Sequence, residues 1–273
     1  MSEVPSSAGL PTAGPGRDDP GRDDPGRDKL GRDKLGHLRD LLGRRRLLGR
    51  SLSLGALTLL TGCDISDGDT VQQALAAVSR WNDGVQAALF GSDRLAREFA
   101  PSALAAEDRY NAYYAKADVP KLDADTYRLT LAGAIGDKRP WRVANFADLP
   151  QVSQITRHIC VEGWSYVGQW GGPTLASFLH RVGADTTARY VGYECADGYY
   201  GGMDMQTALH PQTLIALTRR GETLQPEFGY PFKIRIPTKL GFKNPKFITT
   251  LFVTDRRPPG FWEDRGYNWF SGL

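Results

Sequence analysis

The sequence has few of the residues on which disulfide-stapled proteins and many cofactor sites depend. Its three cysteines, Cys63, Cys160 and Cys195, are too few for a disulfide framework. No C-x-x-C-H motif is present, so the four histidines include no obvious haem attachment site. No G-x-G-x-x-G follows a β-rich run and no P-loop is present, which argues against dinucleotide and nucleoside-triphosphate sites.

An excess of charge of one sign is also lacking over most of the chain. The formal net charge is +3, and residues 1–62 hold 11 of the 34 basic and 8 of the 31 acidic residues. Residues 63–273 are therefore balanced in charge. A nucleic-acid binder needs a basic face to displace counterions, so this class is excluded. A repeat of five residues, GRDDP then GRDKL, fills residues 16–36 and predicts disorder, because it has little apolar surface to bury.

No hydrophobic run is long enough to span a bilayer as a mature helix. The apolar run at residues 52–60 follows Arg44-Arg45-Arg46, and the two together predict an export signal that resembles the twin-arginine type. The run ends at Leu60-Thr61-Gly62-Cys63, which resembles a lipobox and predicts a lipid anchor at Cys63. The alternatives are a basic patch before a buried helix, cleavage by ordinary signal peptidase, or a buried cysteine.

Length and patterning predict an α+β domain behind this leader. Apolar residues at gaps of three and four over residues 71–89 predict an amphipathic packing helix. Strands are predicted around residues 127–131, 155–161, 189–195, 213–218, 232–236 and 247–254, with one helix over residues 173–182 that has Pro at its first turn. We divide the chain into a tail and signal (1–62), a linker with a helix (63–104) and a main folded domain (105–273), and we expect a monomeric subunit.

Cys160 ends a β-rich run and is preceded by Arg157 and His158. A cysteine in this position is most often a small buried hydrophobe. Basic neighbours, however, favour the thiolate, and a soft thiolate suits a heavy transition metal. If strand alternation continued past Cys160, Glu162 would face the same side and could relay protons, or it could serve in a structural hydrogen bond.

The segment His158-Ile159-Cys160-Val161-Glu162-Gly163-Trp164-Ser165 resembles the molybdenum-cysteine segment of the sulfite-oxidase superfamily. It is most similar to the branch of periplasmic protein-methionine-sulfoxide reductases. Residues 195–199, 203–213, 229–246 and 262–272 carry further similarity, so the resemblance covers about residues 105–273. It implies a sulfite-oxidase-type molybdopterin-binding fold of mixed sheets with short helices.

The resemblance implies a molybdenum–molybdopterin cofactor with Cys160 as the metal's protein ligand, and Arg157, His158 and Glu162 as residues that tune it. Lys239, Lys243 and Lys246 cluster in a Gly/Pro-rich loop, which suits a phosphate, although a solvated basic loop is the alternative. Cofactor contacts are predicted for Asn111, Tyr114, Ala115, Cys160, Cys195, Phe228, Lys233, Lys239, Lys243, Asn244, Pro245 and Lys246.

Three of these residues depart from the reductase pattern. Cys195 stands where the reductases have Thr, Phe228 where they have Asn, and Lys233 where they have Arg. Lysine keeps the charge but lacks the bidentate fork of arginine. These departures leave the cofactor in place and put the substrate in doubt.

The resemblance implies oxygen-atom transfer, with an S-oxide or N-oxide as substrate, in an exported enzyme at the periplasmic or extracytoplasmic face of the membrane. Electrons would come from a membrane cytochrome b. Two alternatives remain open: a sulfite-oxidising dehydrogenase, with Arg157, Lys233 and Arg235 binding the dianion, and a non-catalytic exported binding module that keeps the fold.

Overall fold

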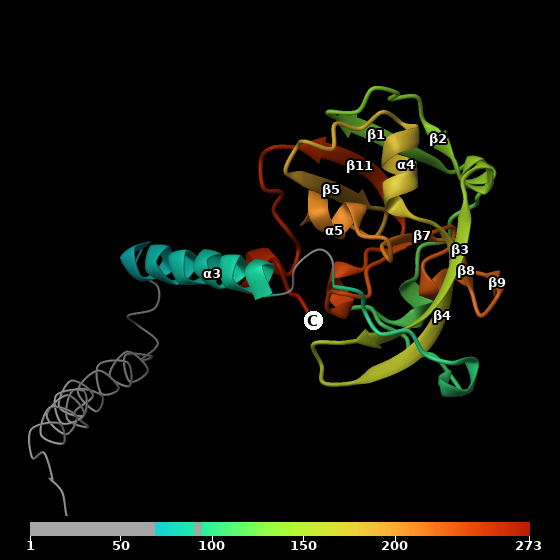
Figure 1. The fold of residues 1–273 in the computed structure, drawn as a ribbon, viewed down its shortest axis with the longest axis horizontal. Helices are drawn as coiled ribbons and strands as arrows, with labels where there is room; N and C mark the ends of the chain where they lie inside the picture. The colour runs from blue at the N-terminus through green and yellow to red at the C-terminus, as the bar shows by residue number, and fades with distance from the viewer. Residues whose placement is uncertain (1–68, 90–93) are drawn as a thin grey trace, which may run out of the picture. The chain divides into compact units, whose positions relative to one another are not determined.

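Strand-forming runs separated by Gly and Pro become three sheets in the computed structural model, which describes residues 69–89 and 94–273 (Figure 1). The predicted tail, repeat, export signal and Cys63 lie outside the described residues. The α+β class, with mixed sheets and short helices as predicted from the sequence, is confirmed.

The largest sheet has five strands in the order β2-β1-β11-β5-β6. Leu129 and Leu131 of β1 are buried while Arg128 and Thr130 are exposed, so the period-two pattern turns one face toward the core. β1 pairs parallel to β11, and the other pairs are antiparallel. The strands are β1 (Arg128–Gly133), β2 (Trp141–Arg142), β5 (Tyr190–Cys195), β6 (Tyr200–Asp204) and β11 (Ile248–Thr254).

The second sheet has the order β3-β4-β8-β9, and the third pairs β10 with β7. β3 and β4 form a long antiparallel hairpin, with Ile159 opposite Ser165 next to its turn. This turn contains Cys160, so the hairpin determines where the predicted metal ligand lies. The strands are β3 (Gln151–Ile159), β4 (Ser165–Pro173), β7 (Leu214–Ala216), β8 (Thr218–Arg219), β9 (Glu222–Thr223) and β10 (Lys233–Arg235).

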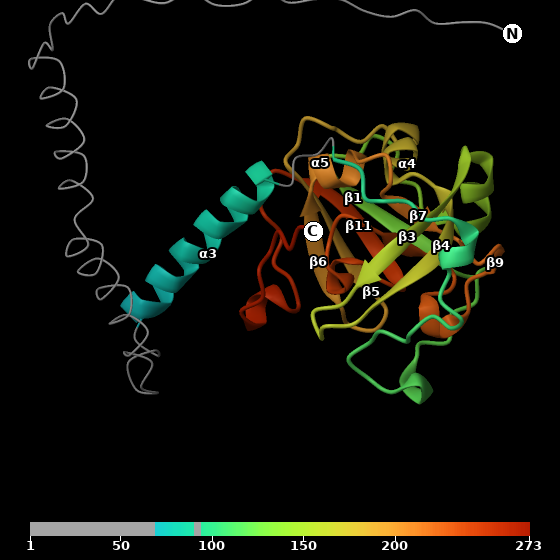
Figure 2. The same cartoon turned by 60° about the horizontal axis from the view of Figure 1, so that its bottom comes forward.

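Two short helices, α4 (Leu175–Arg181) and α5 (Met205–Leu209), lie beside the five-stranded sheet in both views (Figures 1 and 2). The side chain of Thr174 caps α4 by accepting from the Ser177 N–H at 3.1 Å. Pro173 ends β4, so the prediction that it lies in the first turn of the helix is wrong. Leu175, Phe178 and Leu179 are fully buried and join α4 to the main core.

The helix predicted over residues 71–89 is present as α3 (Asp69–Leu89), but Leu75, Val78, Trp81 and Leu89 are exposed, so the predicted packing of its apolar face is not seen. Asp83 joins the helix to the C-terminal segment, since it accepts from the Phe270 N–H and pairs with Arg257. No helix among the described residues has the length and apolarity needed to cross a bilayer. The 3₁₀ turns are Pro101–Ala103, Lys116–Asp118, Val143–Asp148, Pro226–Phe228, Gly241–Lys243 and Glu263–Arg265.

Four strands were not predicted: β2 and β9, which have two residues each, and β4 and β6, in which glycine interrupts the apolar pattern. In β6 a Cβ on Gly201 would lie 2.7 Å from the hydroxyl oxygen of Tyr193, and one on Gly202 would lie 2.7 Å from Pro258. Glycine is therefore needed here for close packing against neighbouring side chains, a requirement that local propensity cannot reveal.

Candidate active site beside Cys160

The end of β3 places Cys160 at a cavity. Thr156 and His158 are buried and Arg157 is exposed, so alternate side chains point to opposite sides of the strand. The strand ends at Ile159, where a turn closed by the Cys160 N–H donating to the Trp164 carbonyl holds the cysteine at the end of the strand. Gly163 in this turn has φ +85°, which glycine adopts without strain.

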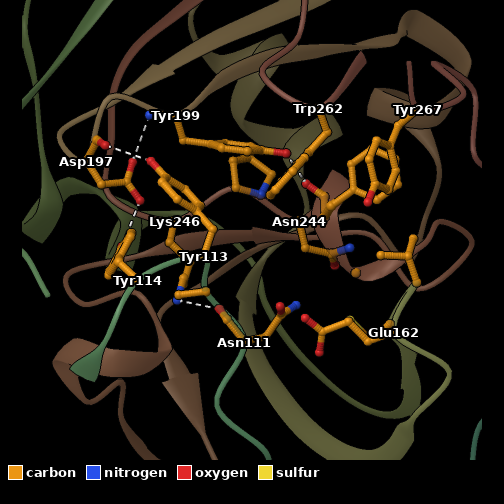
Figure 3. A pocket seen from close by; sticks show the side chains of 16 residues that line it. Asn111, Tyr113, Tyr114, Glu162, Asp197, Tyr199, Asn244, Lys246, Trp262 and Tyr267 are labelled. Atoms are coloured by element: carbon orange, nitrogen blue, oxygen red, sulfur yellow. Dashed lines mark hydrogen bonds between the residues drawn. The ribbon is translucent and has the colours of Figure 1, made fainter. Parts of the chain in front are cut away.

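Cys160 is 5 % exposed and lines a cavity of about 250 Å³, near the lower end of ligand-pocket sizes. Figure 3 shows Asp197 and Tyr114 on one side of this cavity and Glu162 and Tyr267 on the other. Seven residues predicted from the sequence line it: Asn111, Tyr114, Cys160, Glu162, Asn244, Pro245 and Lys246. The sequence analysis did not assign the nine others: Ala112, Tyr113, Val161, Asp197, Tyr199, Gly241, Phe242, Trp262 and Tyr267.

The missed residues form an aromatic wall with one carboxylate. Asp197 accepts from the hydroxyl of Tyr114 at 2.8 Å, and its carbonyl accepts from the hydroxyl of Tyr113 at 2.9 Å. Tyr113 stacks on Phe261 with ring centroids 4.7 Å apart, and Tyr199 donates to the Phe242 carbonyl. These segments are far apart in the sequence, and the only earlier signal was that Asp197, Tyr199, Trp262 and Tyr267 lie in stretches that resemble the reductases.

Glu162 lines the cavity for a different reason from the one expected. Strand alternation does not extend to it, because residues 160–163 form a turn. Its carboxylate is exposed and accepts from the indole N–H of Trp164 at 2.7 Å. The carboxylate is therefore held at the rim of the cavity, in contact with solvent.

Arg157 does not line this cavity. It lies on the other side of β3, with its guanidinium 5.3 Å from the ring centroid of Phe99, in a second cavity. The prediction that it acts beside Cys160 overlooked strand alternation, which places Arg157 opposite His158.

The electrostatics of Cys160 also differ from expectation. Burial raises the pKa of the Cys160 thiol. The backbone N–H groups of Glu162 and Val161, together with Arg109, lower this pKa, but the rise from burial is larger. Burial and nearby cations lower the pKa of His158 well below its ordinary value, so the ring is neutral. Basic neighbours therefore do not bring the pKa of this thiol below its ordinary value, and a bound metal cation would favour its thiolate.

His158 lies behind the cavity and positions Asn111. The Asn111 Nδ2 lies 3.1 Å from His158 Nε2, so the amide donates and the ring proton is on Nδ1. Gly241 packs against both, since a Cβ there would lie 2.6 Å from His158 Nε2 and 3.0 Å from Asn111 Nδ2. Any side chain at position 241 would displace this pair.

Arg235 is a buried positioning residue beneath the cavity. Its guanidinium donates to Asn244 Oδ1 at 2.9 Å and to the Arg157 carbonyl at 2.7 Å, and thereby ties the Asn244 loop to β3. The same Asn244 oxygen accepts from the Ile236 N–H at 2.7 Å. The sequence analysis considered Arg235 only as part of a sulfite pocket.

Three basic side chains near the cavity have no carboxylate partner among the described residues: Lys233 and Arg235 are buried, and Lys246 is partly buried. Burial lowers the pKa of Lys233 well below its ordinary value. Among the described residues, Lys233, Arg235 and Lys246 form no ion pair. Burial lowers the pKa of Lys246 to about 8, and its ammonium donates to the carbonyls of Asn111 and Glu227. Burying unpaired charge is costly, so this arrangement suits a site that receives an anion.

The remaining residues of the predicted cofactor set do not line the cavity. Cys195 is buried in the main core, and Phe228 packs under the guanidinium of Arg219. Lys233 lies 4.9 Å from the ring centroid of Trp170. Lys243 pairs with Glu263, and Lys239 Nζ lies 2.8 Å from the ring centroid of Phe270. Ala115 also lies outside the lining.

Lys239 makes the stability of the fold depend on pH. Burial lowers its pKa from 10.5 to about 7, and Asp204, with Oδ2 at 3.8 Å, offsets this only in part. Between these two values the unfolded chain binds a proton that the folded chain does not, so the free energy of unfolding rises with pH. We expect Lys239→Met to flatten this rise between pH 7 and about pH 10 in urea unfolding.

Exposed Lys138 provides the matched control for this measurement. Lys246 contributes a slope of the same sign in both proteins, so the comparison isolates Lys239. The Lys138→Met variant should keep the wild-type slope. An equal slope in the wild type and the Lys239→Met variant would contradict the prediction.

The observed features fit a polar, anionic cofactor that is bound through sulfur. His158 Nδ1 and Arg235 Nε are buried without a hydrogen-bond partner, which leaves two donors available. Among the described residues no group of three or more His, Cys, Asp or Glu is placed to hold a metal. A metal at Cys160 would therefore take its other ligands from outside the protein.

The fold is of the α+β class. Its buried thiol, with unpaired basic side chains near one cavity, suits the binding of an anionic metal cofactor. The profile of the family described as "Oxidoreductase molybdopterin binding domain" matches residues 116–262, and the chain belongs to this family. It is therefore an oxidoreductase with a molybdenum–molybdopterin cofactor, as predicted from the sequence. The alternative of a non-catalytic binding module is not supported.

Relatives with assigned names agree with this family. The chain is 51% identical over 233 residues to the putative protein-methionine-sulfoxide reductase subunit YedZ1 of Azospira oryzae, covering 85% of this chain and 89% of that protein. It is 34% identical over 128 residues to the protein-methionine-sulfoxide reductase catalytic subunit MsrP of Ralstonia nicotianae, covering 41% and 39%. The sulfane dehydrogenase SoxCD of Paracoccus pantotrophus superposes with a TM-score of 0.47 at 18% identity, covering 50% and 40%.

Proposed function

We propose that this enzyme reduces an S-oxide, with methionine sulfoxide as the reference substrate, and that it does so outside the cytoplasm with electrons from a membrane cytochrome b. The names of the relatives support the reaction. The single observation that favours it from the structure is the aromatic wall of the cavity, made by Tyr113, Tyr199, Phe242, Trp262 and Tyr267. Aromatic rings suit a thioether product, because sulfur packs favourably against them.

The sulfite-oxidising alternative lacks its cations at this cavity. A dianion would need Arg157, Lys233 and Arg235, and none of the three lines the cavity. Arg157 lies on the other side of β3, Lys233 lies over Trp170, and Arg235 is committed to Asn244 and β3.

Within the proposal, Cys160 Sγ is the protein's ligand to molybdenum. Asn111, Tyr114, Asn244, Pro245 and Lys246 hold the pterin and its phosphate, with Lys246 supplying the charge. The bound cofactor supplies the two-electron chemistry of oxygen-atom transfer.

Glu162 is the proposed proton donor. A proton donor is needed because the sulfoxide takes up two electrons and two protons and yields the sulfide and water. The Trp164 indole holds one carboxylate oxygen at 2.7 Å, and exposure lets protons return from solvent. The carboxylate is thus held in place while it remains in exchange with water.

Export and membrane attachment are part of the same proposal. Arg44-Arg45 and the apolar run at residues 52–60 support twin-arginine export, and Cys63 supports a lipid anchor on the extracytoplasmic face. These residues lie outside those that the structure describes. An anchor would keep the enzyme near a membrane donor.

The experiment compares two steady-state assays of the purified holoenzyme. Reduced benzyl viologen with methionine sulfoxide tests reduction, and sulfite with ferricyanide tests oxidation. We expect sulfoxide reduction to exceed sulfite oxidation by at least about 100-fold in kcat/KM, which is about 2.7 kcal/mol of transition-state discrimination. Comparable or greater sulfite oxidation would reject the proposal in favour of the dehydrogenase.

A further inference from the structure

A second cavity, of about 440 Å³, lies on the side of β3 opposite Cys160. Its lining includes Arg94, Arg97 and Arg157 together with the apolar side chains of Leu95, Phe99 and Ile159. We call these residues the arginine cleft. Arg97 and Arg157 both lie against Phe99, with their guanidinium carbons 4.9 and 5.3 Å from the ring centroid.

The arginine cleft carries an excess of positive charge. Among the described residues, no Asp or Glu lines it and none of its three arginines forms an ion pair. All three side chains are exposed, and arginine keeps its charge at any accessible pH. Packing on Phe99 preorders two of the guanidiniums, which lowers the entropy cost of binding a partner.

Residues that are adjacent at the end of β3 line the cleft and the active-site cavity, but the two lie on opposite sides of the strand. Arg157 and Ile159 line the cleft, whereas Cys160 lines the active-site cavity. Arg157 and Cys160 are three residues apart, which corresponds to about 10 Å along an extended strand. A molecule in the cleft would be near the metal ligand without blocking the substrate.

We propose that the arginine cleft docks an acidic face of the one-electron donor, the membrane cytochrome b of the proposed function. This rests on the proposed function, since reduction of each sulfoxide consumes two electrons and two protons, so two reduced carriers deliver one electron each. Guanidinium forks pair bidentately with carboxylates, and arginine is enriched among residues that dominate binding energy at interfaces. Electron-transfer interfaces are small and transient, so one cleft of this size is enough to orient the carrier.

The test uses reduced flavodoxin, an acidic one-electron carrier protein, as donor to the holoenzyme with methionine sulfoxide as substrate. The variant is Arg94→Glu/Arg97→Glu, because both side chains lie away from Cys160. We expect the KM for flavodoxin to rise by at least about 10-fold at low ionic strength, since charge complementarity changes association rates by 10 to 1,000-fold. Wild-type KM should also rise between about 20 mM and 300 mM salt, while that of the variant changes little.

Two controls separate docking from general effects. Lys138→Glu/Arg256→Glu makes the same change in net charge at exposed positions outside the cleft and should keep the wild-type KM for flavodoxin. Reduced benzyl viologen is a small cation that does not need the cleft for docking. With this donor, the rates of sulfoxide reduction by the wild type, the cleft variant and the control variant should agree within about 2-fold. Direct binding of oxidised flavodoxin, measured by calorimetry, gives a readout that does not depend on turnover.

The possible outcomes are distinct. An unchanged KM and unchanged binding in the cleft variant, or equal losses in the control, would overturn the proposal. Loss of binding to vesicles of anionic phosphatidylglycerol without loss of flavodoxin binding would overturn it in favour of a membrane surface. Absence of viologen-linked sulfoxide reduction in the wild type would reject the proposed function, while the binding measurement would still decide the docking site.

Discussion

Replacing Cys160 by serine is expected to abolish sulfoxide reduction, with a fall of more than about 100-fold, and to change or remove the bound molybdenum. Even changes behind the direct ligands lower metal affinity or activity by 10 to 100-fold. Serine keeps the shape of the side chain but replaces a soft thiolate with a hard, poorly ionised oxygen. Because the thiol is buried and its pKa is raised, only a bound metal stabilises the anion here. The measurement is molybdenum per chain by elemental analysis, with the visible absorption of the metal–thiolate bond.

Cys195→Ser is the matched control for this change. Cys195 is also a buried free thiol, but it does not line the cavity, and its pKa is raised well above its ordinary value by burial. We expect this variant to keep about one molybdenum per chain and to lose stability only, by about 1–3 kcal/mol for an imperfectly paired buried hydroxyl. Equal metal loss in both variants would show that burial of a thiol, and not ligation at Cys160, explains the effect.

Local chemistry could be predicted from the sequence because strand period and motif spacing are local properties. The alternation around His158 and Cys160 is contained in a few residues, and so is the Asn244-Pro245-Lys246 stretch. The aromatic wall could not be predicted in this way, since Tyr113 meets Phe261 only after the whole domain has folded. The β4 strand was missed for a related reason: its glycines, such as Gly171 close to Thr218, are selected by packing and not by local propensity.

The three lysines of the Gly/Pro-rich loop show most clearly what sequence cannot decide. Lys239, Lys243 and Lys246 are all candidates for a phosphate from their spacing in one loop, yet only Lys246 lines the cavity. The turn Gly241–Lys243 rotates the backbone so that Lys243 points to Glu263, and Lys239 is held over Phe270. Side-chain direction within an irregular loop depends on its distant partners, so charge pattern alone predicts a cluster that the fold separates.

Lys243→Met is expected to destabilise the fold by about 3–5 kcal/mol, because it leaves one member of a buried ion pair without its partner. The side chains of Lys243 and Glu263 are 2% and 8% exposed, and Glu263 Oε2 already lacks a hydrogen-bond partner. Burial lowers the pKa of Lys243 even beside this carboxylate, which shows how strongly the site is desolvated. Urea unfolding of the wild type and the variant measures the loss.

The double variant Lys243→Met/Glu263→Gln removes both charges at nearly constant volume and should lose less stability than Lys243→Met alone. This would assign the cost to the stranded carboxylate and not to lost packing against Trp269. Molybdenum per folded chain should stay at the wild-type value in both variants, because the ammonium faces Glu263 and not the cavity. A loss of molybdenum with unchanged stability would instead make Lys243 a cofactor ligand, as its spacing in the sequence suggested. The pair of measurements thus decides whether this lysine holds the cofactor or the fold around it.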